Sequence, residues 1–237
     1  MTGAFMSKVC VVMGVGPGNG EAFVRRFSRE GFQVAMLARS ADYLERLQKS
    51  VDGAHAFPCD LMEPEQIRSV LGAIESRLGP VSVMLYNAGG GIFKSVEEAS
   101  LEDFEVNWRI NVQGLVAATK AVLPQLRQHQ TASIIVTSAS AATRGRANTA
   151  PFASAKAAQR SLAQSIARQL GPEKIHVANV VIDGVVDLPR TREWLAQKPD
   201  EFFVQPAAVA DAVWNLCQQD PSAWTFELDI RPFGENW

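Results

Sequence analysis

The sequence predicts an α/β protein with one doubly wound parallel sheet of about seven strands, flanked by helices on both faces. Two observations lead to this fold class. Short apolar runs alternate along the 237 residues with helical segments of ten or more residues, which is typical of parallel strands joined by right-handed crossovers. The first apolar run also passes directly into a glycine-rich turn and then a helix.

Composition sets limits on the class of protein. No linker or composition shift divides the chain, so we expect one domain over residues 1–237. A net charge of -2 gives no electrostatic case for nucleic acid or an anionic membrane. No stretch reaches the roughly 20 apolar residues of a membrane span. Cys10, Cys59 and Cys217 stand far apart without a C-x-x-C motif, so we expect neither disulfides nor a metal site, and a cytoplasmic location fits.

The first expected strand, residues 9–13, ends in the run GVGPGNG at positions 14–20. A helix begins there and ends at Gly31. Backbone N–H groups of such a turn, together with the helix N-terminus, can bind a pyrophosphate because glycines leave the approach open. The alternative is a tight turn that binds nothing. The residues expected at the phosphates are Gly14, Gly18, Asn19 and Gly20.

The second expected strand, residues 32–37, ends in Ala38-Arg39-Ser40, before a helix from about residue 41. In dinucleotide-binding folds the end of this strand carries an acid for the ribose 2′-hydroxyl, or an arginine for a 2′-phosphate. Here the acid is missing and Arg39 is present, which favours NADP(H) over NAD(H). The alternative is that Arg39 is a solvated residue before the helix.

The third expected strand, residues 54–58, leads to Asp60 and Leu61. Asp60 either accepts a hydrogen bond from the adenine amino group or caps the helix that begins near Glu63. A fourth strand, residues 81–85, precedes Asn87-Ala88-Gly89, where small residues let a flat ring pass close to the backbone.

The second half of the chain carries the residues that could do chemistry. A long helix over 101–128 places Asn111 among apolar neighbours, where a buried amide needs partners. A strand at 134–136 leads into a helix over 151–170, on which Phe152 and Lys156 lie four apart and share a face. A sixth strand is expected at 175–182, a connector or substrate lid at 188–203, a helix from Pro206 and a last strand at 225–230.

Taken together, these features resemble the short-chain dehydrogenase/reductase family over essentially the whole chain. The matching residues are the glycines of its T-G-x-x-x-G-x-G motif, its N-A-G motif, its helix asparagine, its catalytic-helix lysine and the glycine of its P-G turn, here Gly14, Gly18, Gly20, Asn87, Ala88, Gly89, Asn111, Lys156 and Gly184. The resemblance implies a Rossmann-type fold and hydride transfer between a nicotinamide and a carbonyl or alcohol carbon. It also implies that Lys156 holds the nicotinamide ribose, that Asn111 anchors a proton-relaying water, and that Gly184 and Val186 lie at the cofactor.

The chain departs from the family where the substrate would be touched. Phe152 stands in place of the proton-donating tyrosine and Ala139 in place of the serine, a pattern that looks closest to a subgroup with Phe at the tyrosine position. In the P-G turn, Asp183 replaces the proline, and Leu188 replaces the threonine that follows. The candidate catalytic residues that remain are Lys156 and Asn111.

Two functions are consistent with this pattern. One is an NADP(H)-dependent oxidoreductase whose proton comes from another hydroxyl, from water or from Lys156, and for which an activated C=C bond is the easier substrate. The other is a non-catalytic NADP(H)-binding sensor or partner protein. The hydroxyls near the site are Ser138, Ser140, Thr149 and Ser154, and the arginines that could receive an acidic substrate, or form a solvated rim, are Arg144, Arg146, Arg190 and Arg192.

The resemblance also implies a homodimer or homotetramer, in which the helices at 101–128 and 151–170 pair across a two-fold axis. Small residues at Ala157, Ala158 and Ala163 would allow the close approach.

Overall fold

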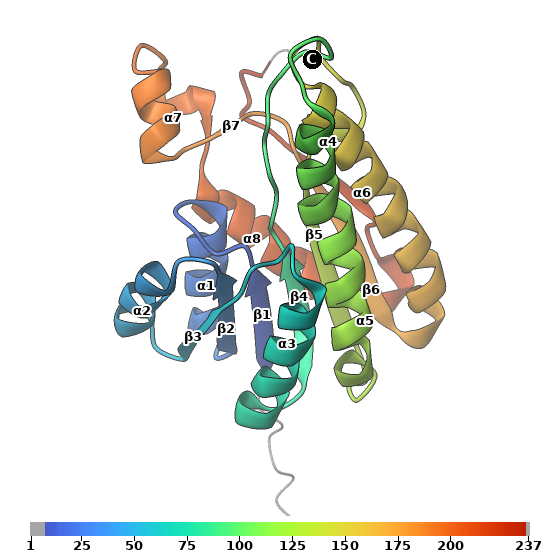
Figure 1. Cartoon of the computed structure of the whole chain (residues 1–237). Coiled ribbons are helices and arrows are strands. Elements are labelled where there is room, and N and C mark those ends of the chain that lie inside the picture. Colours follow the sequence, from blue (N-terminus) through green and yellow to red (C-terminus); the bar gives the residue numbers. More distant parts are fainter. Residues whose placement is uncertain (1–7, 236–237) are drawn as a thin grey trace, which may run out of the picture.

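The computed structural model describes residues 8–235 and contains the expected seven-stranded parallel sheet, in the order β3-β2-β1-β4-β5-β6-β9 (Figure 1). The expected domain of residues 1–237 includes residues 1–7 and 236–237, which lie outside the described residues. The strands are β1 (Val9–Met13), β2 (Gln33–Ala38), β3 (Ala54–Pro58), β4 (Val81–Tyr86), β5 (Ala132–Ala139), β6 (Ile175–Ile182) and β9 (Glu227–Ile230).

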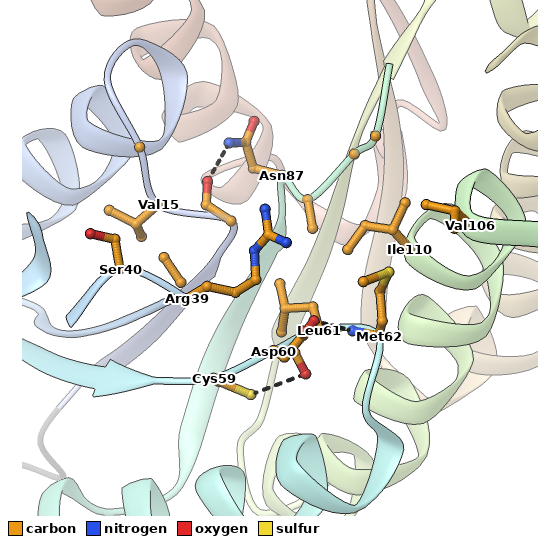
Figure 2. Close-up of a pocket in the computed structure, with 16 residues that line it drawn as sticks. Val15, Arg39, Ser40, Cys59, Asp60, Leu61, Met62, Asn87, Val106 and Ile110 are labelled. Carbon is orange, nitrogen blue, oxygen red and sulfur yellow. Dashed lines mark hydrogen bonds between the residues drawn. The ribbon is translucent and has the colours of Figure 1, made fainter. Parts of the chain in front are cut away.

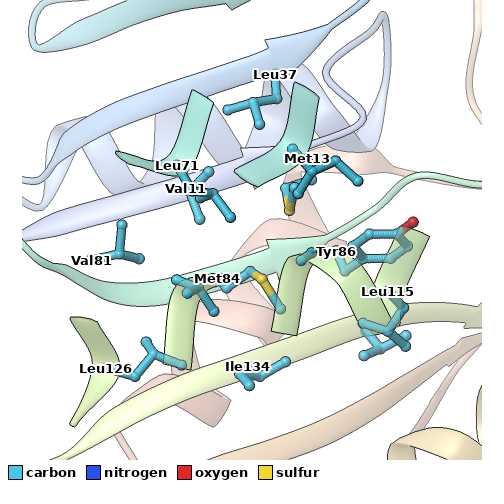
Figure 3. Close-up of a cluster of buried hydrophobic side chains, with 14 of the residues drawn as sticks. Val11, Met13, Leu37, Leu71, Val81, Met84, Tyr86, Leu115, Leu126 and Ile134 are labelled. Carbon is cyan, nitrogen blue, oxygen red and sulfur yellow. The ribbon is translucent and has the colours of Figure 1, made fainter. Parts of the chain in front are cut away.

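Helices cover both faces of the sheet, as a doubly wound fold requires. Buried side chains of α1 (Asn19–Arg29), α2 (Ala41–Ser50) and α8 (Pro206–Cys217) pack on one face. Those of α3 (Pro64–Leu78), α5 (Gly114–Leu126) and α6 (Ala150–Leu170) pack on the other. Figure 3 shows this second core, where alternate strand residues such as Val11 and Met13 meet Leu71 and Leu115. Within residues 8–235, every helix is too short or too polar to span a membrane.

The expected helix over 101–128 is present as continuous helical backbone over 101–126, but it is not α-helical throughout. The structure has α4 (Leu101–Trp108), a π-helical turn (Arg109–Gln113) and then α5. The reason is the close packing on β4: the Tyr86 hydroxyl donates to the Ile110 carbonyl at 2.6 Å, and a Cβ on Gly114 would clash with that hydroxyl. The wider turn makes room for this contact, and π turns of this kind often occur at functional sites.

Several strand boundaries also differ from expectation by one to three residues. The second strand starts at Gln33 rather than residue 32, because the Phe32 N–H donates to the Phe27 carbonyl at 3.2 Å in the turn that ends α1. The last strand starts at Glu227 rather than residue 225, because Thr225 takes part in a turn held by Gln219. The fifth strand is longer than its apolar centre and runs over Ala132–Ala139.

The connector at 188–203 is folded. It forms α7 (Pro189–Trp194), and its last residue begins β8 (Phe203–Val204), which pairs with β7 (Val185–Val186) in a separate two-stranded sheet. Arg192 fastens the segment by ion pairs to Asp187 at 2.7 Å and Asp200 at 2.5 Å.

Candidate functional site

A cavity of about 470 Å³ lies where β1, β2, β3 and β4 end (Figure 2). This is the edge of an open α/β sheet at which ligands bind. Seven of the residues predicted for a cofactor line it together, although they come from four separate stretches of the chain. They are Gly14, Arg39, Asp60, Leu61, Asn87, Ala88 and Gly89.

The glycine turn after β1 is shaped by contact with the end of β4. Gly14 has a φ of 93°, and a Cβ there would lie 2.6 Å from the Ala88 nitrogen. Asn87 fixes the same junction, because its side-chain Nδ2 donates to the Gly14 carbonyl at 2.8 Å. Two residues on, a Cβ on Gly16 would meet no atom within 4 Å, so this part of the turn faces open space in the cavity. The turn therefore fits a bulky anionic group at its open side.

Substitution of Gly14 tests this packing. Gly14→Ala is expected to lower the free energy of unfolding by about 2–4 kcal/mol, because the added methyl group meets backbone atoms and the backbone must keep a left-handed conformation. The measurement is urea denaturation. Gly16→Ala is the control, with an expected change within about 0.5 kcal/mol. Equal stability of the two variants would contradict the described packing.

Arg39 is the cation of the cavity. It follows β2, and its side chain extends into the cavity between the ends of the strands (Figure 2). Within residues 8–235 its guanidinium has no hydrogen-bond or ion-pair partner. The neighbouring Ser40 is the N-cap of α2, and its hydroxyl oxygen accepts from the Tyr43 N–H. Arg39 is thus available to an anionic group of a ligand.

Asp60 does not cap the following helix. The N-cap of α3 is Glu63, and the Asp60 carboxylate accepts from the Met62 N–H at 2.9 Å. This turn holds the carboxylate at the cavity wall beside Leu61.

The other predicted residues of the glycine turn, Gly18, Asn19 and Gly20, do not line this cavity. Gly18 precedes α1, with a φ of 98°, and a Cβ on it would overlap Leu188 Cδ2. Asn19 follows, with its buried Oδ1 lacking a partner among the described residues. A Cβ on Gly20 would lie only 2.7 Å from the Gly14 carbonyl oxygen, so the start of α1 packs closely against the turn.

The segment after β6 approaches Gly18 through Leu188 and does not line the cavity. Val186 Cγ1 lies 3.8 Å from a Cβ position on Gly18, so Val186 and Leu188 both approach the glycine turn. Gly184, near the start of the same segment, packs instead against Val204 and Pro232.

Lys156 and Asn111 meet beside Gly89. A Cβ on Gly89 would lie 3.3 Å from Lys156 Nζ and 3.4 Å from Asn111 Oδ1. Lys156 is buried, and its Nζ donates to the Thr137 carbonyl at 3.0 Å and to Gln159 Oε1 at 2.9 Å. Burial lowers the Lys156 pKa from 10.5 to about 7. The lysine therefore changes charge near neutral pH.

This pKa predicts how stability depends on pH. Between about pH 7 and 10.5 the unfolded chain keeps the Lys156 proton that the folded chain has released. Stability therefore rises with pH in this window, by up to about 1.4 kcal/mol per unit, and is flat below it. Urea denaturation of the native protein and of Lys156→Met at pH 6, 8 and 9.5 measures the free energy of unfolding of each. The value for the native protein minus the value for the variant should increase with pH. A difference independent of pH would contradict the lowered pKa.

The two positions where the family carries hydroxyls are apolar. Ala139 ends β5, and Phe152, in the first turn of α6, packs against Phe93 with ring centroids 5.1 Å apart. Of the nearby hydroxyls, Ser154 donates to the Ala150 carbonyl and Thr149 to the Arg146 carbonyl, so both are tied to backbone.

Two nearby serines remain. Ser138 Oγ is buried without a partner among the described residues. Strand alternation places it on the face of β5 opposite Ala139. Ser140 directly follows Ala139 and is half-buried. Of the four named hydroxyls, that of Ser140 is the one that is neither bonded to backbone nor buried among the described residues.

Most of the arginines named as possible substrate contacts have partners within the chain. Arg144 Nη2 binds both carboxylate oxygens of the buried Asp183, at 3.0 and 2.9 Å. Arg192 is held by Asp187 and Asp200, and Arg190 lies over the Trp194 ring. Arg146 is exposed. Asp183, at the proline position of the family's turn, thus ties β6 to the loop after β5.

Sequence reasoning missed several residues of the site: Met62, Val106 and Ile110 line the cavity, and Gln159 contacts Lys156. Gln159 has the clearest role. It is fully buried, and its Nε2 donates to the Asn111 carbonyl at 2.9 Å while its Oε1 accepts from Lys156. The signal was present, because a glutamine three residues after Lys156 lies on the same helix face. Across the described residues, no group of three or more histidine, cysteine or acidic side chains is placed to hold a metal ion.

The chain is similar to known proteins in both sequence and structure. The family model described as short chain dehydrogenase matches residues 8–199. The chain is 29% identical over 228 residues to meso-2,3-butanediol dehydrogenase of Serratia marcescens, covering 92% of this chain and 90% of the relative.

Solved structures agree in fold. A short-chain dehydrogenase from Rhodopseudomonas palustris is 30% identical, with a TM-score of 0.82, covering 97% of this chain and 100% of that one. An alcohol dehydrogenase from the archaeon Thermococcus sibiricus, complexed with 5-hydroxy-NADP, is 26% identical, with a TM-score of 0.84, covering 97% and 98% of the two chains.

Proposed function

The chain belongs to the short-chain dehydrogenase/reductase family, and from that premise we propose that it is an NADP(H)-dependent oxidoreductase whose proton source is not residue 152. One observation carries the cofactor choice. Arg39 extends into the cavity from the end of β2, without an internal partner among residues 8–235. A guanidinium there suits a 2′-phosphate. The complex of the Thermococcus sibiricus relative with an NADP derivative supports the same cofactor class.

The remaining cavity residues have proposed roles along the dinucleotide. The turn from Gly14 to Gly20 receives the pyrophosphate at the N-terminus of α1. Asp60 and Leu61 bound the adenine. Asn87, Ala88 and Gly89 let the second half of the cofactor pass toward Lys156, while Gly184 and Val186 bound the nicotinamide side. The bound cofactor would supply the hydride.

The apolar pair Ala139 and Phe152 shapes the proposed substrate class. A simple ketone that accepts hydride becomes an alkoxide and needs a strong proton donor at once. An activated C=C bond conjugated to a carbonyl becomes an enolate, which a hydrogen bond stabilises and water later protonates. We therefore propose a conjugated enone or enal as substrate, with Ser140 as the donor to its oxygen. Lys156 and Asn111 complete the site.

We also propose that the chain is one domain and assembles as a homodimer or homotetramer through α4, α5 and α6. Trp108 is half-exposed on α4, and Phe104, Trp108 and Ser154 share a hollow between α4 and α6. One part of the expected interface is wrong: Ala163 is fully buried in the core of its own chain, so only Ala157 and Ala158 remain for a partner. Light scattering should give at least twice the monomer mass, and a monomer would refute the assembly. A cytoplasmic location is proposed from the free cysteines.

Calorimetric titration tests the preference for NADPH over NADH. NADPH oxidation with a panel of enones, enals and ketones tests the proposed substrate class. NADPH should bind at least tenfold more tightly than NADH, and conjugated substrates should be reduced faster than simple ketones. Equal affinity for the two cofactors would contradict the role of Arg39. Faster reduction of simple ketones would contradict the proposed substrate class.

A further inference from the structure

The side-chain amide of Gln159 links the two candidate catalytic residues directly. Its carbonyl oxygen accepts from Lys156 Nζ at 2.9 Å, and its Nε2 donates to the Asn111 main-chain oxygen at 2.9 Å. The side chain is fully buried. Both ends of the amide are thus used, and the direction of both hydrogen bonds is fixed by the chemistry of the amide.

The Asn111 carbonyl that accepts this contact belongs to the π turn. In a regular helix a main-chain oxygen accepts from the N–H four residues later, whereas the turn over Arg109–Gln113 disturbs that pattern. Two successive carbonyls of the turn accept from side chains: Ile110 from the Tyr86 hydroxyl and Asn111 from Gln159. A buried carbonyl left without a donor would cost stability, so the glutamine has a structural role as well.

The same contact fixes the position of the Lys156 amine. Thr137 on β5 and Gln159 on α6 supply two acceptors, and Gly89 at the edge of the cavity lies against Nζ. A long lysine side chain loses considerable rotamer entropy when it is ordered. Here that ordering precedes ligand binding, and preordering of this kind raises affinity.

We propose that Gln159 is a positioning residue that holds Lys156 Nζ at the Gly89 edge of the cavity, ready to bind the ribose of the nicotinamide half. This inference rests on the proposed function. An amide neither gains nor loses a proton near neutral pH, so the link from Lys156 through Gln159 to Asn111 positions the lysine without delivering a proton to it.

Two ligands and two variants test the proposal. NADPH contains the nicotinamide ribose, whereas adenosine 2′,5′-bisphosphate represents only the adenine half with its 2′-phosphate. Gln159→Met, which removes both hydrogen bonds at similar volume, is expected to weaken NADPH binding about tenfold and to leave bisphosphate binding within about twofold. The measurement is calorimetric titration at a temperature where the variant is folded.

Gln125→Met is the matched control. Gln125 is also a buried amide that joins two backbone groups, the Val81 N–H and the Leu71 carbonyl, each at 3.1 Å, but it contacts neither Lys156 nor the cavity. It should lower stability and leave both affinities unchanged. Equal weakening of the two ligands by Gln159→Met, or no weakening of NADPH, would overturn the positioning role.

A measurement on the native protein does not depend on the variant folding. In the nuclear magnetic resonance spectrum, NADPH should shift the Gln159 side-chain amide resonances, while adenosine 2′,5′-bisphosphate should not, and Gln125 should respond to neither. A Gln159 amide unmoved by saturating NADPH would overturn the proposal. If the native protein binds neither ligand, the proposed function itself fails, and the positioning role fails with it.

Discussion

The double variant Ala139→Ser with Phe152→Tyr is expected to reduce simple ketones with NADPH at least about a thousandfold faster than the native protein. A positioned general acid contributes about 10² to 10⁴ in rate, and a hydrogen-bond donor to the developing oxyanion about 10² to 10³. Both substituted residues lie in regular elements: Ala139 ends β5, and Phe152 lies one turn before Lys156 on α6. The measurement is kcat/KM on a ketone panel.

The single variants and a displaced tyrosine provide the controls. Each single substitution should recover only part of the gain, because the two groups act on the same oxygen. Phe93→Tyr places a phenol on the ring that touches Phe152, at a centroid distance of 5.1 Å, and should give no gain. If the double variant binds NADPH with native affinity and still fails to reduce ketones, these positions do not form a substrate site.

Arg39→Asp is expected to weaken NADPH binding by about a hundredfold and to bring NADH binding to at least equal strength. The substitution removes a charge-assisted hydrogen bond to the 2′-phosphate, worth about 1.5–3 kcal/mol. It also places a carboxylate where a ribose 2′-hydroxyl can donate to it. Titration with each cofactor measures the two affinities.

Arg46→Asp is the control for the change in net charge. Arg46 is exposed on α2, over the Tyr43 ring and outside the cavity, so the same charge reversal there should change NADPH affinity by less than about threefold. Comparable losses in the two variants would mean that Arg39 acts through the overall field of the protein. Unchanged NADPH affinity in Arg39→Asp would remove Arg39 from the site.

The parts of the fold that could be predicted from the sequence are those that local patterns determine. The first strand, the glycine turn and the helix after it follow one another directly, so apolar runs and glycines were sufficient to find them. The cavity residues were predicted because the ends of parallel strands meet at one edge of the sheet. Arg39 and Asp60 lie together in the structure for that reason.

The parts that could not be predicted depend on contacts between distant segments. At the π turn, Gly114 packs against Tyr86 and Leu61, which come from other parts of the chain. A helical pattern over 101–128 carries no sign of that contact. Likewise, the spacing of Gln159 from Lys156 indicates a shared face, but only the packing of α6 on the π turn brings its amide to Asn111.

Hydride transfer from stereospecifically labelled NADPH tests the central claim most directly. The native protein would be given NADPH deuterated at either face of C4, with conjugated enones and enals and with simple ketones, and the products would be examined by mass spectrometry. We expect a reduced conjugated product to contain deuterium when one face of C4 is labelled, and to contain none when the other face is labelled. Tight binding of NADPH with no deuterium transferred to any acceptor would contradict an oxidoreductase and indicate a protein that binds the cofactor without reacting.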